Sequence, residues 1–444
     1  MKKLHIQTYG CQMNQHDSDR IVQVMKDAGY TLTDAAEDAD LVLLNTCSVR
    51  DKAEQKVYSA LGRWRELKEK KRGEMIIGVG GCVAQQEGEA LLRRVAYLDL
   101  VFGTHNIHKL PQMVEEVESL GSRPVEIDFY REPAYMEDLR GRPEVHGPKA
   151  FVTIMEGCNK VCSFCVVPYT RGRELSRPSE RILGEVRELV RQGVKEVMLL
   201  GQNVNSYGKT SAGELSFPEL LQRINEITGV ERIRFTTSHP QDLSPELIEA
   251  YVTLEKLCEH LHLPVQSGSD EVLKRMRRGY NREEYLKRIY HLRDQRPDVA
   301  LSTDIIVGFP GETEKEFEQT LEILREVEYD ELFAFHYSPR PHTAAAKMYP
   351  NDVPMEVKKS RLKAVLDLQN QISLRKNRAK IGTLEQILVE GSSKLGREQI
   401  MGRTRSNKIV NVKGDEKLVG EMIPVRITAA AANSLLGELA GEAT

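Results

Sequence analysis

Hydrophobic residues recur in short runs along most of the chain, and longer amphipathic stretches separate the runs. In the N-terminal part, apolar runs of strand length cover residues 5–9, 40–45 and 75–79. Strands that alternate with helices are typical of an open, mostly parallel sheet. We therefore predict an α/β domain over residues 1–118.

Six further apolar runs alternate with helical patterns between residues 149 and 375, at 151–155, 196–200, 233–236, 260–264, 301–307 and 332–337. This alternation predicts a partial (β/α) barrel. Residues 119–148 mix prolines and glycines with charges, which is typical of a linker. From 376 to 444, β-like runs at 385–390, 399–404, 409–412 and 421–429 are separated by glycine turns and predict a small β-barrel.

The composition excludes several classes of protein. The 444 residues are 40% hydrophobic and 29% charged, and no run approaches the roughly 18 apolar residues of a membrane span. The first ten residues alternate like a strand and lack the apolar segment of a secretory signal, so we expect a cytoplasmic protein without a membrane partner. The net charge of −3 gives no global sign of nucleic-acid binding. From residue 376 onward, however, 11 Lys and Arg face 8 Asp and Glu, so the tail is basic.

The cysteines carry the strongest chemical signal. The chain has seven, an odd number, and disulfides are rare in a reducing compartment. Cys158, Cys162 and Cys165, the loop trio, form a C-x3-C-x2-C motif directly after a predicted strand. Structural zinc is the alternative, but it takes four protein ligands, and the nearest histidines in sequence are His146 and His239. An iron–sulfur cube with one iron left open fits three thiols better.

A second set of cysteines is spread over the N-terminal domain. Cys11, Cys47 and Cys82, the sheet trio, are 36 and 35 residues apart, and each follows a predicted strand. Carboxyl ends of parallel strands meet at one edge of a sheet, so three distant thiols can converge there. Buried structural thiols are the alternative, but independent core residues would seldom all fall at strand ends. The pattern favours a second cluster, and we assign Cys258 to packing.

A C-x3-C-x2-C motif after the first strand of an α/β barrel resembles the signature of the radical S-adenosylmethionine (SAM) superfamily. The two trios, the N-terminal α/β domain and the basic β tail together resemble its methylthiotransferase family over essentially the whole chain. Residues 9–14 (YGCQMN) and 165–174 (CVVPYTRGRE) are similar to the branch that acts on N6-dimethylallyladenosine in tRNA.

The resemblance implies function, cofactors and site residues. It implies two 4Fe-4S clusters, one on the loop trio and an auxiliary one on the sheet trio, with all six cysteines needed for catalysis. S-adenosyl-L-methionine would act as methyl donor and as radical source. The product would carry a methylthio group on C2 of the prenylated adenosine next to the anticodon.

Several polar stretches follow the barrel strands, at the rim where catalytic loops gather. Each of their residues is equally open to an ordinary capping or packing role. The predicted cofactor contacts are Phe164, Asn203, Ser238, Gln266, Ser267, Asp304 and Ser338.

The resemblance also implies partners: the anticodon stem-loop of tRNA, an electron donor such as flavodoxin or ferredoxin, and an iron–sulfur carrier. We expect a monomer. The basic tail resembles a TRAM domain, whose β-surface could follow phosphates, although a charge run is usually a solvated face. Its basic residues are Lys394, Arg397, Arg403, Arg405, Lys408, Lys413 and Lys417. A second basic group, Lys274, Arg275, Arg277 and Arg278, could line the RNA path, and Trp64, Tyr169 and Tyr280 could stack on bases.

Two other functions stay open at this point. The first is a sister methylthiotransferase that acts on threonylcarbamoyl-adenosine or on a ribosomal protein. The second is a non-catalytic, metal-stabilised RNA-binding protein, which would bind zinc and would not consume SAM.

Overall fold

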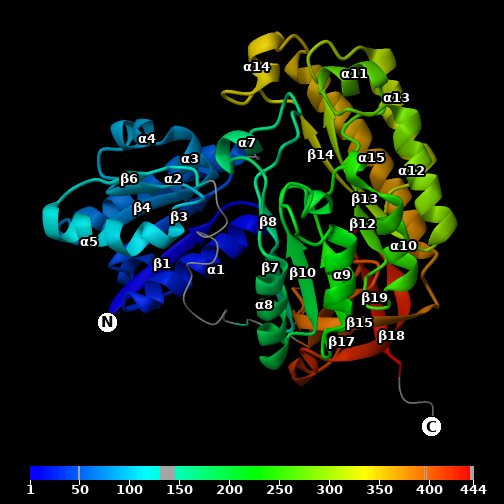
Figure 1. The fold of residues 1–444 in the computed structure, drawn as a ribbon, viewed down its shortest axis with the longest axis horizontal. Helices are drawn as coiled ribbons and strands as arrows, with labels where there is room; N and C mark the ends of the chain where they lie inside the picture. The colour runs from blue at the N-terminus through cyan, green and yellow to red at the C-terminus, as the bar shows by residue number, and fades with distance from the viewer. Residues whose placement is uncertain (49–50, 131–144, 146, 395, 397, 441–444) are drawn as a thin grey trace.

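The computed structural model describes residues 1–48, 51–130, 145, 147–394, 396 and 398–440 (Figure 1). The N-terminal domain is a parallel six-stranded sheet in the order β2-β1-β3-β4-β5-β6. Its strands are β1 (Lys2–Thr8), β2 (Tyr30–Leu32), β3 (Leu41–Thr46), β4 (Ile76–Gly81), β5 (Leu100–Phe102) and β6 (Val125–Glu126). Every residue of β3 and β4 is buried, as expected for central parallel strands covered on both faces.

Helices cover both faces of this sheet. On one face, α1 (Gln12–Asp27) and α5 (Leu110–Leu120) pack against it. On the other face lie α2 (Asp51–Lys70), α3 (Cys82–Glu87) and α4 (Glu89–Arg94), and Trp64 is part of that core. The predicted domain is therefore present, and through β6, which pairs with β5, its sheet continues into the stretch predicted as a linker. Residues 131–144 and 146 of that stretch lie outside the described residues.

The central domain contains the six parallel strands that the apolar runs predict. They form two sheets, β11-β10-β7 and β12-β13-β14, which an isolated parallel bridge between Ile233 and Leu257 joins. The strands are β7 (Lys149–Thr153), β10 (Glu196–Leu200), β11 (Arg232–Phe235), β12 (His260–His262), β13 (Ala300–Val307) and β14 (Glu331–His336). The packed helices are α8 (Ser179–Arg191), α9 (Phe217–Asn225), α10 (Pro245–Thr253), α12 (Arg282–Gln295), α13 (Glu314–Val327) and α15 (Met355–Arg378). This arrangement confirms the partial barrel.

The C-terminal domain is a closed barrel in the order β15-β16-β17-β19-β18. Its strands are β15 (Leu384–Ser392), β16 (Gln399–Thr404), β17 (Ile409–Lys413), β18 (Met422–Ala430) and β19 (Leu435–Leu439), the last of which the sequence pattern did not predict. Two buried arginines at the start of β11 hold this domain under the central one. Arg232 donates hydrogen bonds to the carbonyl oxygens of Arg403 (2.6 Å) and Gln386 (2.9 Å). Arg234 donates to those of Thr404 (2.7 Å) and Arg405 (2.9 Å).

Three basic residues of the tail form ion pairs, either with the central domain or within the C-terminal barrel. Arg405 forms a forked pair with Glu259, with N–O distances of 2.7 to 3.0 Å. Lys408 lies 3.2 Å from Asp330, and Arg403 lies 3.3 Å from Glu390. The prediction that the whole run follows RNA phosphates is therefore wrong for these three arginine and lysine residues.

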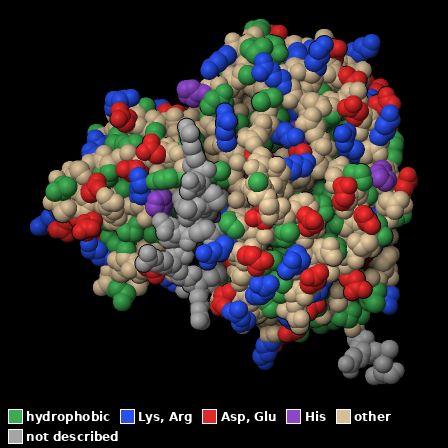
Figure 2. Space-filling view, in the orientation of Figure 1, with side chains coloured by type: hydrophobic (Ala, Val, Ile, Leu, Met, Phe, Trp, Pro, Cys, Tyr) green, Lys and Arg blue, Asp and Glu red, His purple; other side chains and the backbone are tan. Residues whose placement is uncertain are grey.

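Of the seven basic residues of the tail, Lys394, Lys413 and Lys417 are exposed, while Arg397 lies outside the described residues. On the face drawn in Figure 2, Lys and Arg side chains are interspersed with Asp and Glu and form no continuous basic strip. On this face (Figure 2), the exposed lysines of the C-terminal barrel stand singly among acidic side chains.

Loss of the Arg405 fork should loosen the C-terminal domain. Arg405→Ala removes the pair with Glu259 and the hydrogen bonds to the carbonyls of Glu255 and Leu257. Removing one partner of a largely buried pair costs about 3 kcal/mol. We expect limited proteolysis to release the C-terminal barrel faster than in the parent protein, whereas Lys413→Ala, on the same barrel surface, should leave the rate unchanged. Equal rates for Arg405→Ala and the parent would contradict this docking role.

Candidate functional site

The loop trio lies between two short strands, β8 (Met155–Glu156) and β9 (Leu175–Ser176), which pair antiparallel. The amide of Cys158 donates to the carbonyl of Gly172 (3.2 Å), and the amide of Cys165 donates to the carbonyl of Cys162 (3.1 Å). Gly157 has φ +76°, and a Cβ there would lie 2.0 Å from the carbonyl oxygen of Arg173, so only glycine fits. The backbone thus folds back on itself and brings the three thiols together.

Burial and mutual repulsion oppose ionisation of these thiols. Burial raises the pKa of Cys158 to about 11 and that of Cys165 to about 12, and the neighbouring thiols of the trio add to both shifts. The guanidinium of Arg278 compensates, because its Nη1 lies 3.2 Å from the sulfur of Cys162. Arg278 is buried and also donates to the carbonyl of Pro264, so its predicted place on the RNA path is wrong.

The sheet trio converges as the strand ends predict. Cys11 is the N-cap of α1, Cys47 directly follows β3, and Cys82 begins α3, while the strands β1, β3 and β4 are neighbours in the sheet. Cys47 and Cys82 are buried and Cys11 is exposed. A hydrogen bond with Cys47, assisted by the charge of Arg171, lowers the pKa of Cys11 to about 6. Cys11 is therefore ready to ionise, and the thiolate is the form that binds metal.

Two asparagines that the sequence reasoning missed hold the sheet trio. Asn14 donates to Asn45 (3.3 Å) and to the carbonyl of Thr46 (3.1 Å), and its Oδ1 lies 3.4 Å from the sulfur of Cys11. Asn45 donates back to the carbonyl of Asn14 (2.8 Å). Both side chains are fully buried. This reciprocal pair fixes the start of α1 against the end of β3. Asn14 is part of the YGCQMN motif, so the motif could have indicated its importance.

Buried polar atoms without a protein partner occur in all three domains, and several of them follow strands of the central barrel. Among the described residues, Asn203 Oδ1, Ser238 Oγ and Gln266 Oε1 are buried and accept or donate no hydrogen bond. Thr237 and Gln266 both adopt positive φ, at 68° and 73°, which costs about 1 kcal/mol or more at a residue other than glycine. Buried unpaired groups on strained backbone are typical of a ligand site. The three predicted contacts therefore lie where a polar ligand would be bound.

His239 belongs to the same rim. Burial lowers its pKa to about 2, so the imidazole is neutral. Its Nδ1 accepts a hydrogen bond from the amide of Gln241 (3.3 Å), which leaves the proton on Nε2, and Nε2 has no partner among the described residues. His239 thus presents one donor at the rim.

The other predicted contacts have different surroundings. Phe164 packs against an apolar cluster that includes Met276 and Phe309. Ser267 is fully buried, and its hydroxyl lies 3.3 Å from that of Thr320 and accepts from the amide of Ser269. Asp304 lies on β13, 3.5 Å from His262, and Ser338 is half-buried just after β14. Phe164 and Ser267 therefore have structural contacts that account for them.

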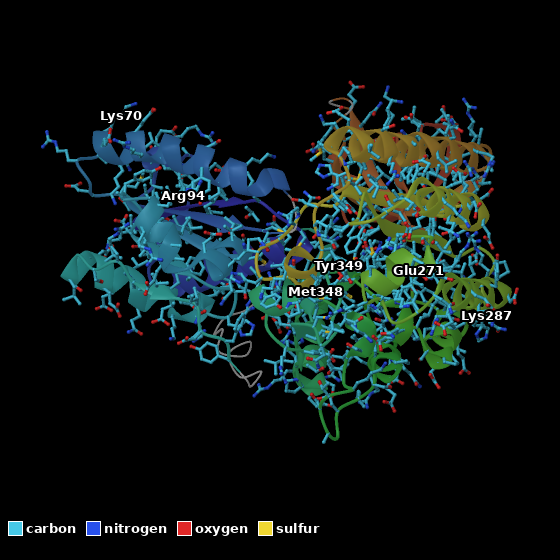
Figure 3. The ribbon with its side chains drawn as sticks, turned by 90° about the horizontal axis from the view of Figure 1, so that it is seen from above. Lys70, Arg94, Glu271, Lys287, Met348 and Tyr349 are labelled. Carbon is cyan, nitrogen blue, oxygen red and sulfur yellow. The ribbon has the colours of Figure 1, made fainter. Side chains whose placement is uncertain are left out.

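The candidate stacking residues separate into two groups. Trp64 and Tyr280 are buried, and the hydroxyl of Tyr280 donates to backbone carbonyls, so both are packing residues and their predicted stacking is wrong. Tyr169 in α7 (Val167–Thr170) is 44% exposed beside the cysteine loop. Arg277 is exposed and contacts Met348, which in Figure 3 lies on the side of the central domain that faces the N-terminal domain. Tyr169, Lys274 and Arg277 thus stay accessible to a partner.

The two trios have similar surroundings. Each trio offers three thiols and one buried arginine, Arg278 at the loop trio and Arg171 at the sheet trio. Among the described residues, no three Cys, His, Asp or Glu side chains are grouped closely enough for a single metal ion.

Comparisons with known proteins agree with this geometry. Residues 3–103 match the Uncharacterized protein family UPF0004, residues 152–324 the Radical SAM superfamily and residues 378–440 the TRAM domain. Among solved structures, a radical S-adenosylmethionine methyltransferase, TsrM, from Kitasatospora setae aligns with a TM-score of 0.57 and 13% identity. It covers 78% of this chain and 75% of that chain, which establishes the shared fold.

Closer relatives align over nearly the whole chain. The tRNA-2-methylthio-N(6)-dimethylallyladenosine synthase of Geobacter metallireducens is 53% identical over 439 residues, covering 99% of this chain and 98% of that protein. The synthase of Geobacter sulfurreducens is 53% identical over 438 residues, covering 99% and 97%. The chain therefore belongs to the tRNA-2-methylthio-N(6)-dimethylallyladenosine synthase family of radical SAM enzymes.

Proposed function

We propose that this chain attaches a methylthio group to C2 of N6-dimethylallyladenosine next to the anticodon of tRNA. One observation carries the proposal: two separate cysteine trios, each with three thiols and a compensating arginine, lie on the two sides of one domain junction. A single 4Fe-4S cluster would suffice to cleave SAM, so a second trio indicates a second task in the same enzyme. The sister substrates gain no support, since the relatives named above carry the dimethylallyladenosine name.

Each part of the chain has a distinct role in this proposal. The clusters and SAM, when bound, supply the sulfur ligand, the methyl group and the radical. Cys158, Cys162 and Cys165 hold one cluster, and Arg278 balances its charge. Asn203, Ser238 and Gln266 bind polar groups of SAM at the rim, together with His239. Cys11, Cys47 and Cys82 would hold the auxiliary cluster.

The partners follow from the chemistry. The substrate is the anticodon stem-loop of a prenylated tRNA, whose target base can be turned out of a single-stranded loop. An electron donor such as flavodoxin or ferredoxin supplies the electron, and an iron–sulfur carrier loads the clusters. A monomeric state and a cytoplasmic location stay predictions. None of the helices in the described part of the chain combines the length and hydropathy needed to cross a bilayer.

Nucleoside analysis tests the proposal. A bacterial strain that lacks its own synthase accumulates unmodified N6-dimethylallyladenosine, and expression of this chain should restore the 2-methylthio derivative. A strain that contains only threonylcarbamoyl-adenosine as candidate substrate should show no change. If this chain instead adds a methylthio group only to threonylcarbamoyl-adenosine, the sister activity replaces the proposal.

Exposed lysines of the C-terminal barrel should contribute to tRNA affinity through phosphates. Replacing Lys394, Lys413 and Lys417 together with alanine should weaken tRNA binding. The slope of the logarithm of the association constant against the logarithm of the salt concentration should become shallower by about 0.7 to 0.9 for each phosphate contact removed. Electrophoretic mobility shifts at several salt concentrations measure the slope. Lys287→Ala is the control, because Lys287 is exposed on α12, on the side away from the N-terminal domain (Figure 3). An unchanged slope in the triple variant would refute the role of this surface.

A further inference from the structure

The short segment 170–172 lies between the two cysteine trios. It follows α7, which sits at the junction of the N-terminal and central domains (Figure 1). The carbonyl of Gly172 accepts the hydrogen bond from the amide of Cys158 (3.2 Å), so one end of the segment holds the loop trio. The side chain of Arg171 extends the other way and pairs with Asp17 of α1. Burial raises the pKa of Cys82 in the sheet trio, and the positive charge of Arg171 opposes that shift. Two adjacent residues thus connect a ligand of one site with a ligand of the other.

The guanidinium of Arg171 is buried in a network of charges from both domains. It pairs with Asp17 of α1 and, through Nη1, with Glu156 of β8 at 3.3 Å. Glu156 is also approached by Arg20 (3.8 Å) and His105 (3.5 Å) of the N-terminal domain. Because Asp17, Glu156 and Arg171 are all shielded from water, their geometry is much more tightly fixed than that of a surface ion pair.

The backbone of the segment is held from the N-terminal side as well. Thr104 Oγ1 donates to the carbonyl of Thr170 (2.8 Å), and His105 Nε2 lies 3.1 Å from the carbonyl of Arg171. Thr104 and His105 are buried just after β5. The segment therefore cannot move relative to the N-terminal domain without breaking several buried hydrogen bonds at once.

We propose that Arg171 is a positioning residue that sets the auxiliary cluster against the SAM-binding loop through its buried ion pairs and tunes the auxiliary cluster through its positive charge beside Cys82. The proposal rests on the proposed function, because that function requires both clusters to act on one adenosine. Partners that hydrogen bond to metal ligands fix the orientation of the ligands and shift the reduction potential of a cluster. The sequence motif contains Arg171, but only the fold shows that its side chain reaches across the domain junction.

The test uses a pair of matched variants of the full chain. Arg171→Met alone would leave Asp17 buried and unpaired, so Asp17→Asn is introduced with it. The control is Arg361→Met with Glu312→Gln, which removes an equally buried pair of 2.9 Å within the central domain, one that involves no cysteine. Both double variants are loaded with iron and sulfide anaerobically, and their folding is checked by circular dichroism.

Two measurements distinguish positioning from mere stability. The first is the reduction potential of the auxiliary cluster, followed by electron paramagnetic resonance with the loop cysteines replaced by alanine so that only this cluster remains. We expect a more negative potential without Arg171, because a buried positive charge beside the sheet trio is lost, and no shift in the control. The second is the methylthio product formed per 5′-deoxyadenosine, which should fall by about tenfold or more without Arg171.

Equal potentials and equal product ratios in the two double variants would overturn the proposal. Loss of the auxiliary cluster from a folded Arg171 variant, with the loop cluster retained, would support it. Should the double variant fail to fold, Arg171→Lys is judged by the same two measurements, because lysine keeps the charge and loses the forked geometry. If the parent enzyme makes no methylthio product on prenylated tRNA, the proposed function is wrong. The reduction potential of the auxiliary cluster still tests the role of Arg171 in that case.

Discussion

Cys158→Ala is expected to abolish both SAM cleavage and methylthio formation. Only three thiols would hold the loop cluster, and alanine removes one of them while it keeps the backbone amide that donates to Gly172. Loss of one ligand leaves two, which cannot retain a cubane that already has one open iron. Chromatography of 5′-deoxyadenosine and of the tRNA nucleosides under anaerobic reduction measures both reactions.

Cys258→Ala is the matched control for this experiment. Cys258 is more deeply buried than Cys158, and it lies beside Arg234 in the central domain, away from both trios. Its replacement should retain activity and cost only the packing of a small side chain, about 1 kcal/mol of stability. Substantial 5′-deoxyadenosine production by Cys158→Ala would contradict the assignment of the loop trio.

Cys47→Ala is expected to uncouple the two halves of the reaction. The loop trio, its Arg278 and the polar rim stay intact, so SAM is still cleaved to 5′-deoxyadenosine. The sheet trio loses a buried ligand, together with the hydrogen bond that lowers the pKa of Cys11. Methylthio product should therefore fall below detection while some cleavage persists.

The ratio of the two products makes this prediction specific. In the parent enzyme, the amounts of 5′-deoxyadenosine and of 2-methylthio-N6-dimethylallyladenosine in tRNA should rise together when prenylated tRNA is present. In Cys47→Ala only the first should rise. Product formation by this variant would show that the sheet trio does not carry the sulfur chemistry.

Periodicity predicted the large elements well, because burial on two faces leaves long apolar runs. All six strands of the central barrel and the three strands that precede Cys11, Cys47 and Cys82 were found in this way. The strands β2, β5 and β6 have two or three residues, too few for any pattern to mark them, and β6 continues the sheet into the predicted linker. Strand-end position was therefore enough to find both cysteine sites.

Charged residues were predicted less well, because sequence does not show which partner a long side chain reaches after folding. Arg278 was assigned to RNA and instead lies against Cys162, while Arg405 and Lys408 pair with acidic residues of the central domain. Asn203, Ser238 and Gln266 are different, since their position after a strand placed them at the rim, and their unpaired atoms agree with a ligand contact.

Quantification of iron, sulfide and zinc in anaerobically reconstituted protein tests the central claim most directly. The account predicts about eight iron and eight sulfide per chain, falling to about four of each in Cys158→Ala and in Cys47→Ala, with negligible zinc. Zinc near one or two per chain, or about four irons in the parent that only one of the two substitutions removes, would contradict it.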